Sequence, residues 1–262
     1  MKTFITSINE KLYRSYGARF IDTWKQHARD DIKLIVCFEG DIPDEIFLKS
    51  SEKVSIISIN SNEQNRFLNK FGHLNEARGI RLYKNLIDPK SLNFKYNYRF
   101  DAIRFSFKIF SYIKCFEMNL IKSDFAWIDS DVVCLRDFDS LDLKGIFPEN
   151  NQLASYLGRM KFPQPNPYSE CGFVAYNFNH PMCKKFIDDM YGYYESGELF
   201  TLPEWHDCMV FDSIRIKYQN LKVDFKNLSA HIPNADHPFM QTELALYFDH
   251  LKGPERKIKG HS

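Results

Sequence analysis

Four short apolar segments constrain the fold of this chain more than any other feature of its sequence. They cover residues 4–7, 32–38, 54–59 and 125–128. Each is too short for a typical helix, and β-branched and aromatic residues are frequent among them. Residues 12–27, between the first two segments, carry large apolar residues at helical spacing. Because strands that alternate with helices form β-α-β units, we predict an α/β fold of Rossmann-like type, with a mainly parallel central sheet flanked by helices.

The rest of the chain gives weaker signals. Residues 62–97 are rich in Asn, Lys and Arg, and we expect helical or irregular excursions at the surface there. The prolines of residues 162–167 predict an extended loop. Further helices are predicted over residues 98–116, 182–194 and 207–218, and a further strand over residues 171–176.

Composition excludes several classes of function. The chain has 35 Lys plus Arg against 34 Asp plus Glu, so no overall field attracts nucleic acid. No apolar run approaches the ~20 residues that a transmembrane helix needs, although peripheral membrane contact stays open. Six cysteines are scattered without CxxC spacing, which is typical of reduced thiols. We therefore expect a cytoplasmic protein, with 262 residues and 44% apolar content that suit one large domain.

Two aspartates mark a candidate metal site. Asp129 and Asp131 directly follow the apolar segment 125–128, at what should be the carboxyl end of a sheet strand, where α/β proteins bind ligands. Two close carboxylates next to a buried strand need a compensating cation, and their oxygens suit Mn²⁺ or Mg²⁺. A second Asp-x-Asp sequence, Asp137 to Asp139, is predicted to be only a solvated turn.

With these residues the chain resembles the GT-A fold glycosyltransferases of the nucleotide-diphospho-sugar transferase superfamily, in particular the glycogenin and bacterial galactosyltransferase group. In that family an Asp-x-Asp motif follows a central strand, as Asp129-Ser130-Asp131 does here. A second family motif, His-x-x-Gly-x-x-Lys, is similar to the sequence that starts at His250. Gly253 matches its glycine, whereas Arg256 stands at the expected Lys position and Lys257 follows it.

Two further segments resemble the family. Residues 169–177, with Gly172, are similar to a family strand that carries acceptor contacts. Residues 204–210 are similar to the family's Asp-Gln-Asp helix start, with Asp207 at the position of the second acid. The resemblance therefore covers essentially the whole chain, and we expect a single GT-A domain, with a nucleotide-sugar-binding half in residues 1–131 and an acceptor-binding half in residues 132–262.

The resemblance implies a set of site residues. The metal ligands would be Asp129, Asp131 and His250. Asp101 is expected to orient the guanidinium of Arg104 through a bidentate pair. Whether Arg256 or Lys257 binds the diphosphate stays open at this stage. The expected donor-binding residues are Thr6, Ser7, Asn9, Asp101, Arg104, Lys108, Asp129, Ser130, Gly253, Arg256 and Lys257.

The implied activity is metal-dependent transfer of a sugar from a nucleotide-diphosphate donor, with a UDP-sugar favoured, to a hydroxyl acceptor such as a glycan or a lipid or polysaccharide precursor. Glu170 and Asp207 are the candidates for a general base, and the sequence leaves retention or inversion of configuration open. Two alternatives remain. A sugar nucleotidyltransferase would carry a glycine-rich loop after the first strand, but residues 6–14 contain no glycine. A catalytically silent nucleotide-sugar-binding protein is favoured only by the shifted position of Lys257.

Overall fold

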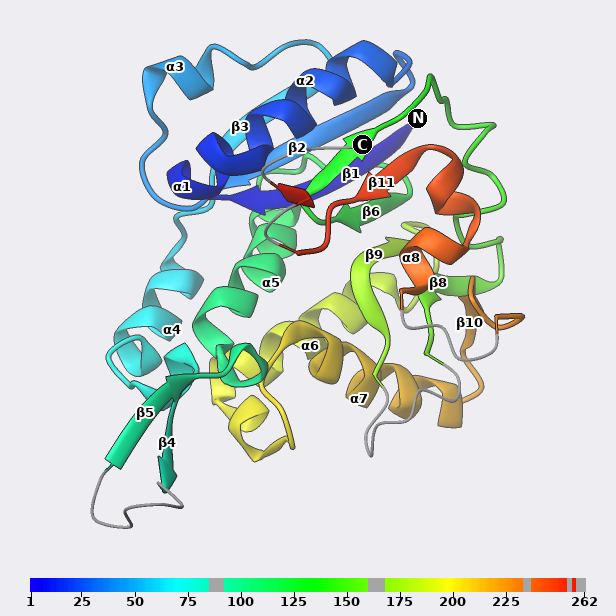
Figure 1. The fold of residues 1–262 in the computed structure, drawn as a ribbon. Helices are drawn as coiled ribbons and strands as arrows, with labels where there is room; N and C mark the ends of the chain where they lie inside the picture. Colours follow the sequence, from blue (N-terminus) through cyan, green and yellow to red (C-terminus); the bar gives the residue numbers. More distant parts are fainter. Residues whose placement is uncertain (85–91, 160–167, 233–236, 254–255, 258–262) are drawn as a thin grey trace.

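The core of the protein is a seven-stranded sheet with helices on both faces (Figure 1). The computed structural model describes residues 1–84, 92–159, 168–232, 237–253 and 256–257. The strand order is β10-β8-β9-β6-β1-β2-β3. The strands are β1 (Lys2–Ile8), β2 (Ile32–Phe38), β3 (Val54–Ser58), β6 (Phe125–Ile128), β8 (Gln152–Leu157), β9 (Glu170–Tyr176) and β10 (Asp224–Asn227).

The predicted fold class is confirmed. Strand β1 pairs in parallel with β2 and β6, β2 with β3, and β10 with β8. Strand β9 runs antiparallel to both of its neighbours, so the sheet is mixed but mainly parallel. The helices are α1 (Glu10–Leu12), α2 (Ala18–His27), α3 (Asp44–Phe47), α4 (Asn62–Phe71), α5 (Ala102–Glu117), α6 (Cys183–Ser196), α7 (Asp207–Asn220) and α8 (Pro238–Gln241). A π-helical turn, Tyr13–Gly17, joins α1 to α2.

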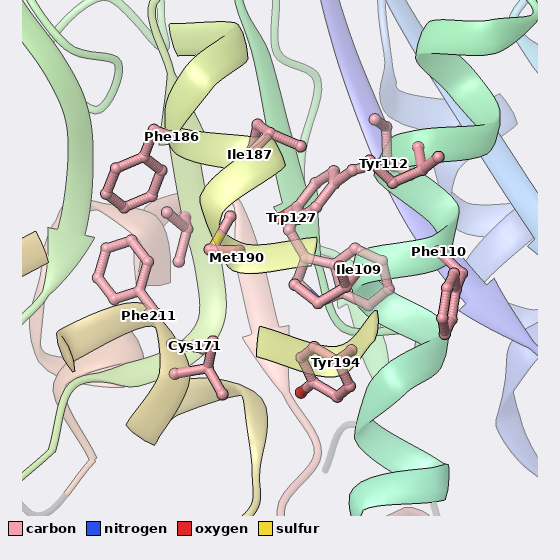
Figure 2. Close-up of a cluster of buried hydrophobic side chains, with 14 of the residues drawn as sticks. Ile109, Phe110, Tyr112, Trp127, Cys171, Phe186, Ile187, Met190, Tyr194 and Phe211 are labelled. Carbon is pink, nitrogen blue, oxygen red and sulfur yellow. The ribbon is translucent and has the colours of Figure 1, made fainter. Parts of the chain in front are cut away.

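Two apolar clusters cover the two faces of the sheet. Neighbouring residues of β1 point to opposite faces, so Phe4 belongs to one cluster and Ile5 to the other. The face of Phe4 packs against α2, where Trp24 is fully buried. The face of Ile5 packs against α5, α6 and α7, and Figure 2 shows part of this second cluster around Trp127. Burial on both faces explains why the strands were recognisable as continuous apolar runs.

A short ribbon beside the sheet brings the carboxyl end of the chain to the Asp-x-Asp segment. Strand β7 (Val132–Cys134) pairs in antiparallel fashion with β11 (Phe248–His250), and His250 lies opposite Val132. The backbone N–H of Leu251 donates to the carbonyl of Asp131 at 2.8 Å. This pairing joins residues that lie more than a hundred positions apart in the sequence.

The prediction for residues 62–97 was incomplete. Helix α4 is followed by an antiparallel pair, β4 (Ile80–Lys84) and β5 (Leu92–Tyr96), which extends away from the rest of the protein (Figure 1). Its cross-strand residues Leu82 and Phe94 are 53% and 63% exposed. Because these strands are solvated, their sequences lack the continuous apolar character that identified β1 and β2. The loop predicted for residues 162–167 lies outside the described residues.

No helix within the described ranges combines the length and the apolar character that are required to cross a membrane. Five of the six cysteines are buried, and Cys208 is partly exposed. The cytoplasmic location and the division into donor and acceptor halves stay predictions. The sheet itself draws strands from both of those halves, since β8, β9 and β10 extend it beyond β6.

The packing around Trp24 generates the first test. The ring contacts Phe4 edge-on, with centroids 4.9 Å apart, and stacks on Phe248 at 6.2 Å. Trp24→Ala should lower the free energy of unfolding by about 3–5 kcal/mol, because the cavity left behind cannot close completely. Urea denaturation measures this change. The matched control is Leu141→Ala, whose side chain is 78% exposed, and it should stay within about 0.5 kcal/mol of the wild type. Equal losses in both variants would contradict the described core.

Candidate active site

A cavity of about 830 Å³ opens at the carboxyl ends of β1, β2 and β6. Ser7 lies near the end of β1, Glu39 directly follows β2 and Asp129 directly follows β6, and all three side chains line the cavity. The cavity is large enough for a nucleotide linked to a sugar. Its place at the ends of parallel strands is where α/β sheets expose backbone and side-chain groups to ligands.

Asp129, Asp131 and His250 converge on one wall of this cavity. His250 Nε2 lies 3.1 Å from Asp131 Oδ1 and 3.9 Å from Asp129 Oδ2. One ligand atom from each of the three side chains lies within 4.8 Å of the other two. The position of Asp129 is fixed by its backbone N–H, which donates to the carbonyl of Gly172 at 2.9 Å, and by Trp127 Nε1, which donates to Oδ1 at 2.7 Å.

Burial and the close approach of charges shift the pKa values of Asp129, Asp131 and His250. Burial and the neighbouring charge of Asp131 raise the pKa of Asp129. Burial acts in the same direction on Asp131, but His250 and Lys257 outweigh it and hold its pKa well below the usual range. Burial alone would lower the pKa of His250, whereas Asp131 and Glu170 raise it to about 9. Two carboxylates and an imidazole nitrogen at these distances could together hold a divalent metal ion.

The two basic residues that follow Gly253 face different partners. Lys257 lines the cavity, contacts Asp131 Oδ2, and its Nζ lies 5.2 Å from the centroid of the Tyr16 ring. Arg256 donates from one guanidinium nitrogen, Nη2, to both oxygens of the buried Asp249 carboxylate, at 2.7 Å each. Lys257 is therefore the residue of the two that can reach a ligand in the cavity while Arg256 pairs with Asp249.

Glu170 lies on the opposite side of the His250 ring from the aspartates. Its Oε1 lies 3.4 Å from His250 Nδ1 and 3.4 Å from His237 Nε2, and it contacts Lys252. Burial would raise the pKa of Glu170, but these cationic and imidazole neighbours hold it well below its usual range. His237 and Lys252 were not expected at the site, because only the folded chain brings residues 237–252 against β9.

Lys108 and Asp207 form a buried ion pair on another wall. Lys108 Nζ donates to the carbonyl of Cys171 at 2.6 Å and to the carboxylate of Asp207, and lies 3.9 Å from Asp129 Oδ1. Burial disfavours the charged amine, but Asp207 and Asp129 outweigh that cost and raise the pKa of Lys108. Asp207 is held in place as the first residue of α7, where the side chain of His206 accepts from the N–H of Met209 at 3.4 Å.

The expected nucleotide contacts lie around Glu39. Ser7 and Asn9 line the cavity and donate to the two carboxylate oxygens of Glu39, at 3.2 and 3.0 Å. The neighbouring hydroxyl of Thr6 is buried without a hydrogen-bond partner. Burial raises the pKa of Glu39. Glu39 was missed by the sequence analysis, although its place directly after a predicted strand could have marked it in the way that Asp129 was marked. Ser130 and Gly253 also line the cavity.

The expected bidentate pair between Asp101 and Arg104 differs from the structure. Asp101 Oδ1 instead accepts from the backbone N–H of Arg104 at 3.0 Å, as the N-cap of α5, and Oδ2 accepts from the Tyr96 hydroxyl at 2.9 Å. The guanidinium of Arg104 donates to the same hydroxyl at 3.5 Å. A carboxylate three residues before a backbone N–H satisfies a helix start, and this local demand fixes Asp101. Both residues nevertheless line the cavity.

No family model and no curated protein matches the sequence of this chain. Solved structures do match. One is the WbbM bifunctional glycosyltransferase in its apo form, at 11% identity and a TM-score of 0.49, with 96% of this chain covered. This chain spans 45% of that longer protein.

Two other matches are similar in length to this chain. A glycosyltransferase involved in the glycosylation of the major capsid of PBCV-1 is 9% identical, with 99% of both chains covered and a TM-score of 0.49. The galactosyltransferase LgtC, in complex with donor and acceptor sugar analogs, is 11% identical, with 96% and 87% of the two chains covered and a TM-score of 0.49. All three proteins are glycosyltransferases. The sequence motifs resemble the same class of enzyme. Since each TM-score lies below 0.5, the function proposed below rests on the site of this chain itself.

The environment of Glu170 predicts a specific response to acid. Its depressed pKa contributes stability that is present above the ordinary value of 4.5 and is lost as the pH falls below it. The free energy of unfolding of the wild type should therefore fall more steeply below pH 4.5 than that of Glu170→Gln, by up to about 1.4 kcal/mol per pH unit. Urea denaturation across an acid pH series measures the slopes. Glu10→Gln, whose side chain is 54% exposed, should keep the wild-type slope. A wild-type slope in Glu170→Gln would show that the carboxylate is not held ionised.

Proposed function

We propose that this chain is a metal-dependent glycosyltransferase that moves a sugar from a nucleotide-diphosphate donor, with a UDP-sugar favoured, to a hydroxyl of a glycan or of a lipid or polysaccharide precursor. The observation that carries the proposal is the convergence of Asp129, Asp131 and His250 beside Lys257 in a cavity at the carboxyl edge of the sheet. Four groups that can bind a metal ion or stabilise negative charge, from two distant segments of the chain, meet in this cavity, as a donor diphosphate would require.

Asp129, Asp131 and His250 would hold Mn²⁺ or Mg²⁺, which supplies Lewis-acid stabilisation of the charge that develops on the departing diphosphate. The protein prepares His250 for this role from the other side of its ring. Glu170 Oε1 lies 3.4 Å from Nδ1, and a negative charge there favours the proton on Nδ1 when Nε2, which faces the aspartates, gives its proton up to bind a cation. We therefore assign Glu170 to the orientation of His250.

Lys257 is proposed to bind the diphosphate. Its ammonium contacts Asp131, and a metal ion held by that carboxylate would leave the ammonium available to pair with a phosphate oxygen. Ser7, Asn9 and Glu39 lie at the ends of β1 and β2, and we assign them to the nucleoside. Lys108, between Asp129 and Asp207, is assigned to the transferred sugar.

The proposal extends to the stereochemistry of transfer. The two candidate bases, Glu170 and Asp207, are each paired with a lysine, Lys252 and Lys108 respectively. Transfer of a proton to either carboxylate would leave the ammonium of its lysine without its partner in the cavity wall. We therefore favour transfer in which an oxygen of the departing phosphate takes the acceptor proton on the face from which it leaves, with retention of configuration.

The donor site gives a direct test of the proposed function. Calorimetric titration of UDP and GDP should show binding of one nucleotide in the presence of Mn²⁺, with the affinity lost when EDTA is added. Asp131→Asn should weaken that binding at least about 10-fold, because one carboxylate charge at the cation is removed.

The second Asp-x-Asp sequence supplies the matched control. Asp139 caps a surface turn by accepting from the backbone N–H groups of Leu141 and Asp142, at 2.8 and 2.9 Å. Asp139→Asn should leave nucleotide binding unchanged. Metal-independent binding, or equal losses in the two variants, would contradict the assigned metal site, and absence of binding by any nucleotide with any metal would sink the glycosyltransferase proposal.

Gly172 tests the metal site without a change of charge. A Cβ atom at this residue would lie 2.8 Å from His250 Cε1 and 3.4 Å from Asp129 Oδ2, so Gly172→Ala must displace the imidazole or the carboxylate. The dissociation constant for Mn²⁺, measured by electron paramagnetic resonance, should rise about 10-fold. Gly192→Ala is the control, since a Cβ atom there meets nothing within 4 Å. Unchanged Mn²⁺ affinity in Gly172→Ala would show that these two side chains do not hold the ion.

A further inference from the structure

Two thiols stand side by side in the wall of the cavity. Cys171 lies on β9 and Cys208 is the second residue of α7, and both line the cavity. Their sulfur atoms and a carboxylate oxygen of Asp207 all lie within 4.8 Å of one another. Cys208 Sγ lies 3.6 Å from Asp207 Oδ1. The proposed sugar transfer assigns no role to either sulfur.

The two thiols differ in acidity in a complementary way. The neighbouring Cys171 thiol lowers the pKa of Cys208 to about 7, with His206 acting in the same direction against burial and the charge of Asp207. The start of the 14-residue helix α7 adds a favourable backbone dipole for a thiolate. Burial and the contact with Cys208 raise the pKa of Cys171 well above its ordinary value. Cys208 can thus act as the thiolate that attacks an oxidant, and Cys171 as the thiol that then attacks the oxidised Cys208 sulfur.

We propose that Cys171 and Cys208 form a redox modification site, in which a peroxide converts the two thiols into a reversible disulfide that suppresses sugar transfer. The second half of this proposal rests on the proposed function. The Cys208 thiolate attacks one peroxide oxygen, the O–O bond breaks, and Cys208 becomes a sulfenic acid while hydroxide leaves. Cys171 sulfur then attacks the Cys208 sulfur, the S–O bond breaks, and the thiol proton leaves with the hydroxide as water. Two thiols are oxidised, one peroxide is reduced, and two waters form after protonation.

A disulfide between Cys171 and Cys208 would displace the groups that hold Lys108. Lys108 Nζ donates to the carbonyl of Cys171 itself and to the carboxylate of Asp207, the residue before Cys208. Sulfur atoms within 4.8 Å must approach to about 2.05 Å in a disulfide, so β9 or α7 must shift or their side chains rotate. Gly172, next to Cys171, also accepts from the N–H of Asp129, which connects the link to the metal-binding segment.

A second thiol pair shows why access matters as much as proximity. Cys37 Sγ and Cys115 Sγ lie 3.7 Å apart, but both residues are 0% exposed and belong to the apolar core. Cys208, in contrast, is partly exposed and lines the cavity. A peroxide in solution can therefore reach the cavity pair first. Cys37→Ser is the matched control for a nearby pair without access.

The chemical half is tested by mass spectrometry, without any measurement of sugar transfer. Wild type, Cys208→Ser and Cys37→Ser are treated with hydrogen peroxide, free thiols are alkylated, and the peptides are mapped. We expect the wild type and Cys37→Ser to lose the mass of two hydrogen atoms and to yield a linked peptide that joins Cys171 to Cys208. Cys208→Ser should yield none. A link between Cys37 and Cys115, or oxidation of Cys208 to sulfinic acid without a link, would overturn the proposed site whatever the enzyme does.

The regulatory half is tested on each protein relative to its own untreated sample. Peroxide should lower the transfer rate of the wild type at least about 10-fold, and dithiothreitol should restore it, since the rate then follows the linked fraction. The rate of Cys208→Ser should be insensitive to the same treatment. A linked wild type with an unchanged rate would overturn suppression of transfer. If no transfer is found in any sample, the proposed function fails, while the linked peptide still decides whether the modification site exists.

Discussion

The close approach of two carboxylates at the end of a buried strand is the constraint on which the site depends. Asp129 and Asp131 cannot both stay ionised beside β6 without positive partners, and the fold supplies His250 and Lys257 from the carboxyl end of the chain. The pairing of β11 with β7 delivers these residues. This short ribbon therefore links the integrity of the fold to the charge balance of the cavity.

The same balance extends along the cavity wall. Lys108 pairs with Asp207, and Lys252 pairs with Glu170, so the buried acids of the site are matched with cations before any ligand enters. Such pairs contribute little net stability, because desolvation offsets much of their attraction. These pairs fix the orientation of the charged side chains before any ligand binds, so the side chains need no further rearrangement when it does. The thiols of Cys171 and Cys208 adjoin one of these pairs, which makes its geometry sensitive to their chemistry.

Several elements could be predicted because their signals are local. Strands β1, β2 and β6 are buried on both faces and appear as apolar runs, and the carboxyl end of β6 marked Asp129 and Asp131. The solvated hairpin of β4 and β5 and the short strand β11 have no such signal. The antiparallel direction of β9 could not be read from its composition, because strand direction is set by the connections and by the neighbouring strands.

The sequence by itself determined the α/β class and the Asp-x-Asp segment, since period and burial are written in neighbouring residues. The solvated turn predicted for Asp137 to Asp139 was wrong in part, because Phe138 is buried and bridges to Ala28, and the turn begins only after Asp139. Only the tertiary structure decided that Lys257 faces the cavity while Arg256 pairs with Asp249, and that Glu170 faces the ring of His250. The partner of each of these side chains depends on which residues from distant parts of the sequence lie beside it in the fold, and on which buried charge it has to neutralise. Such matches are properties of the folded chain, because desolvation is felt only once the partners are brought together.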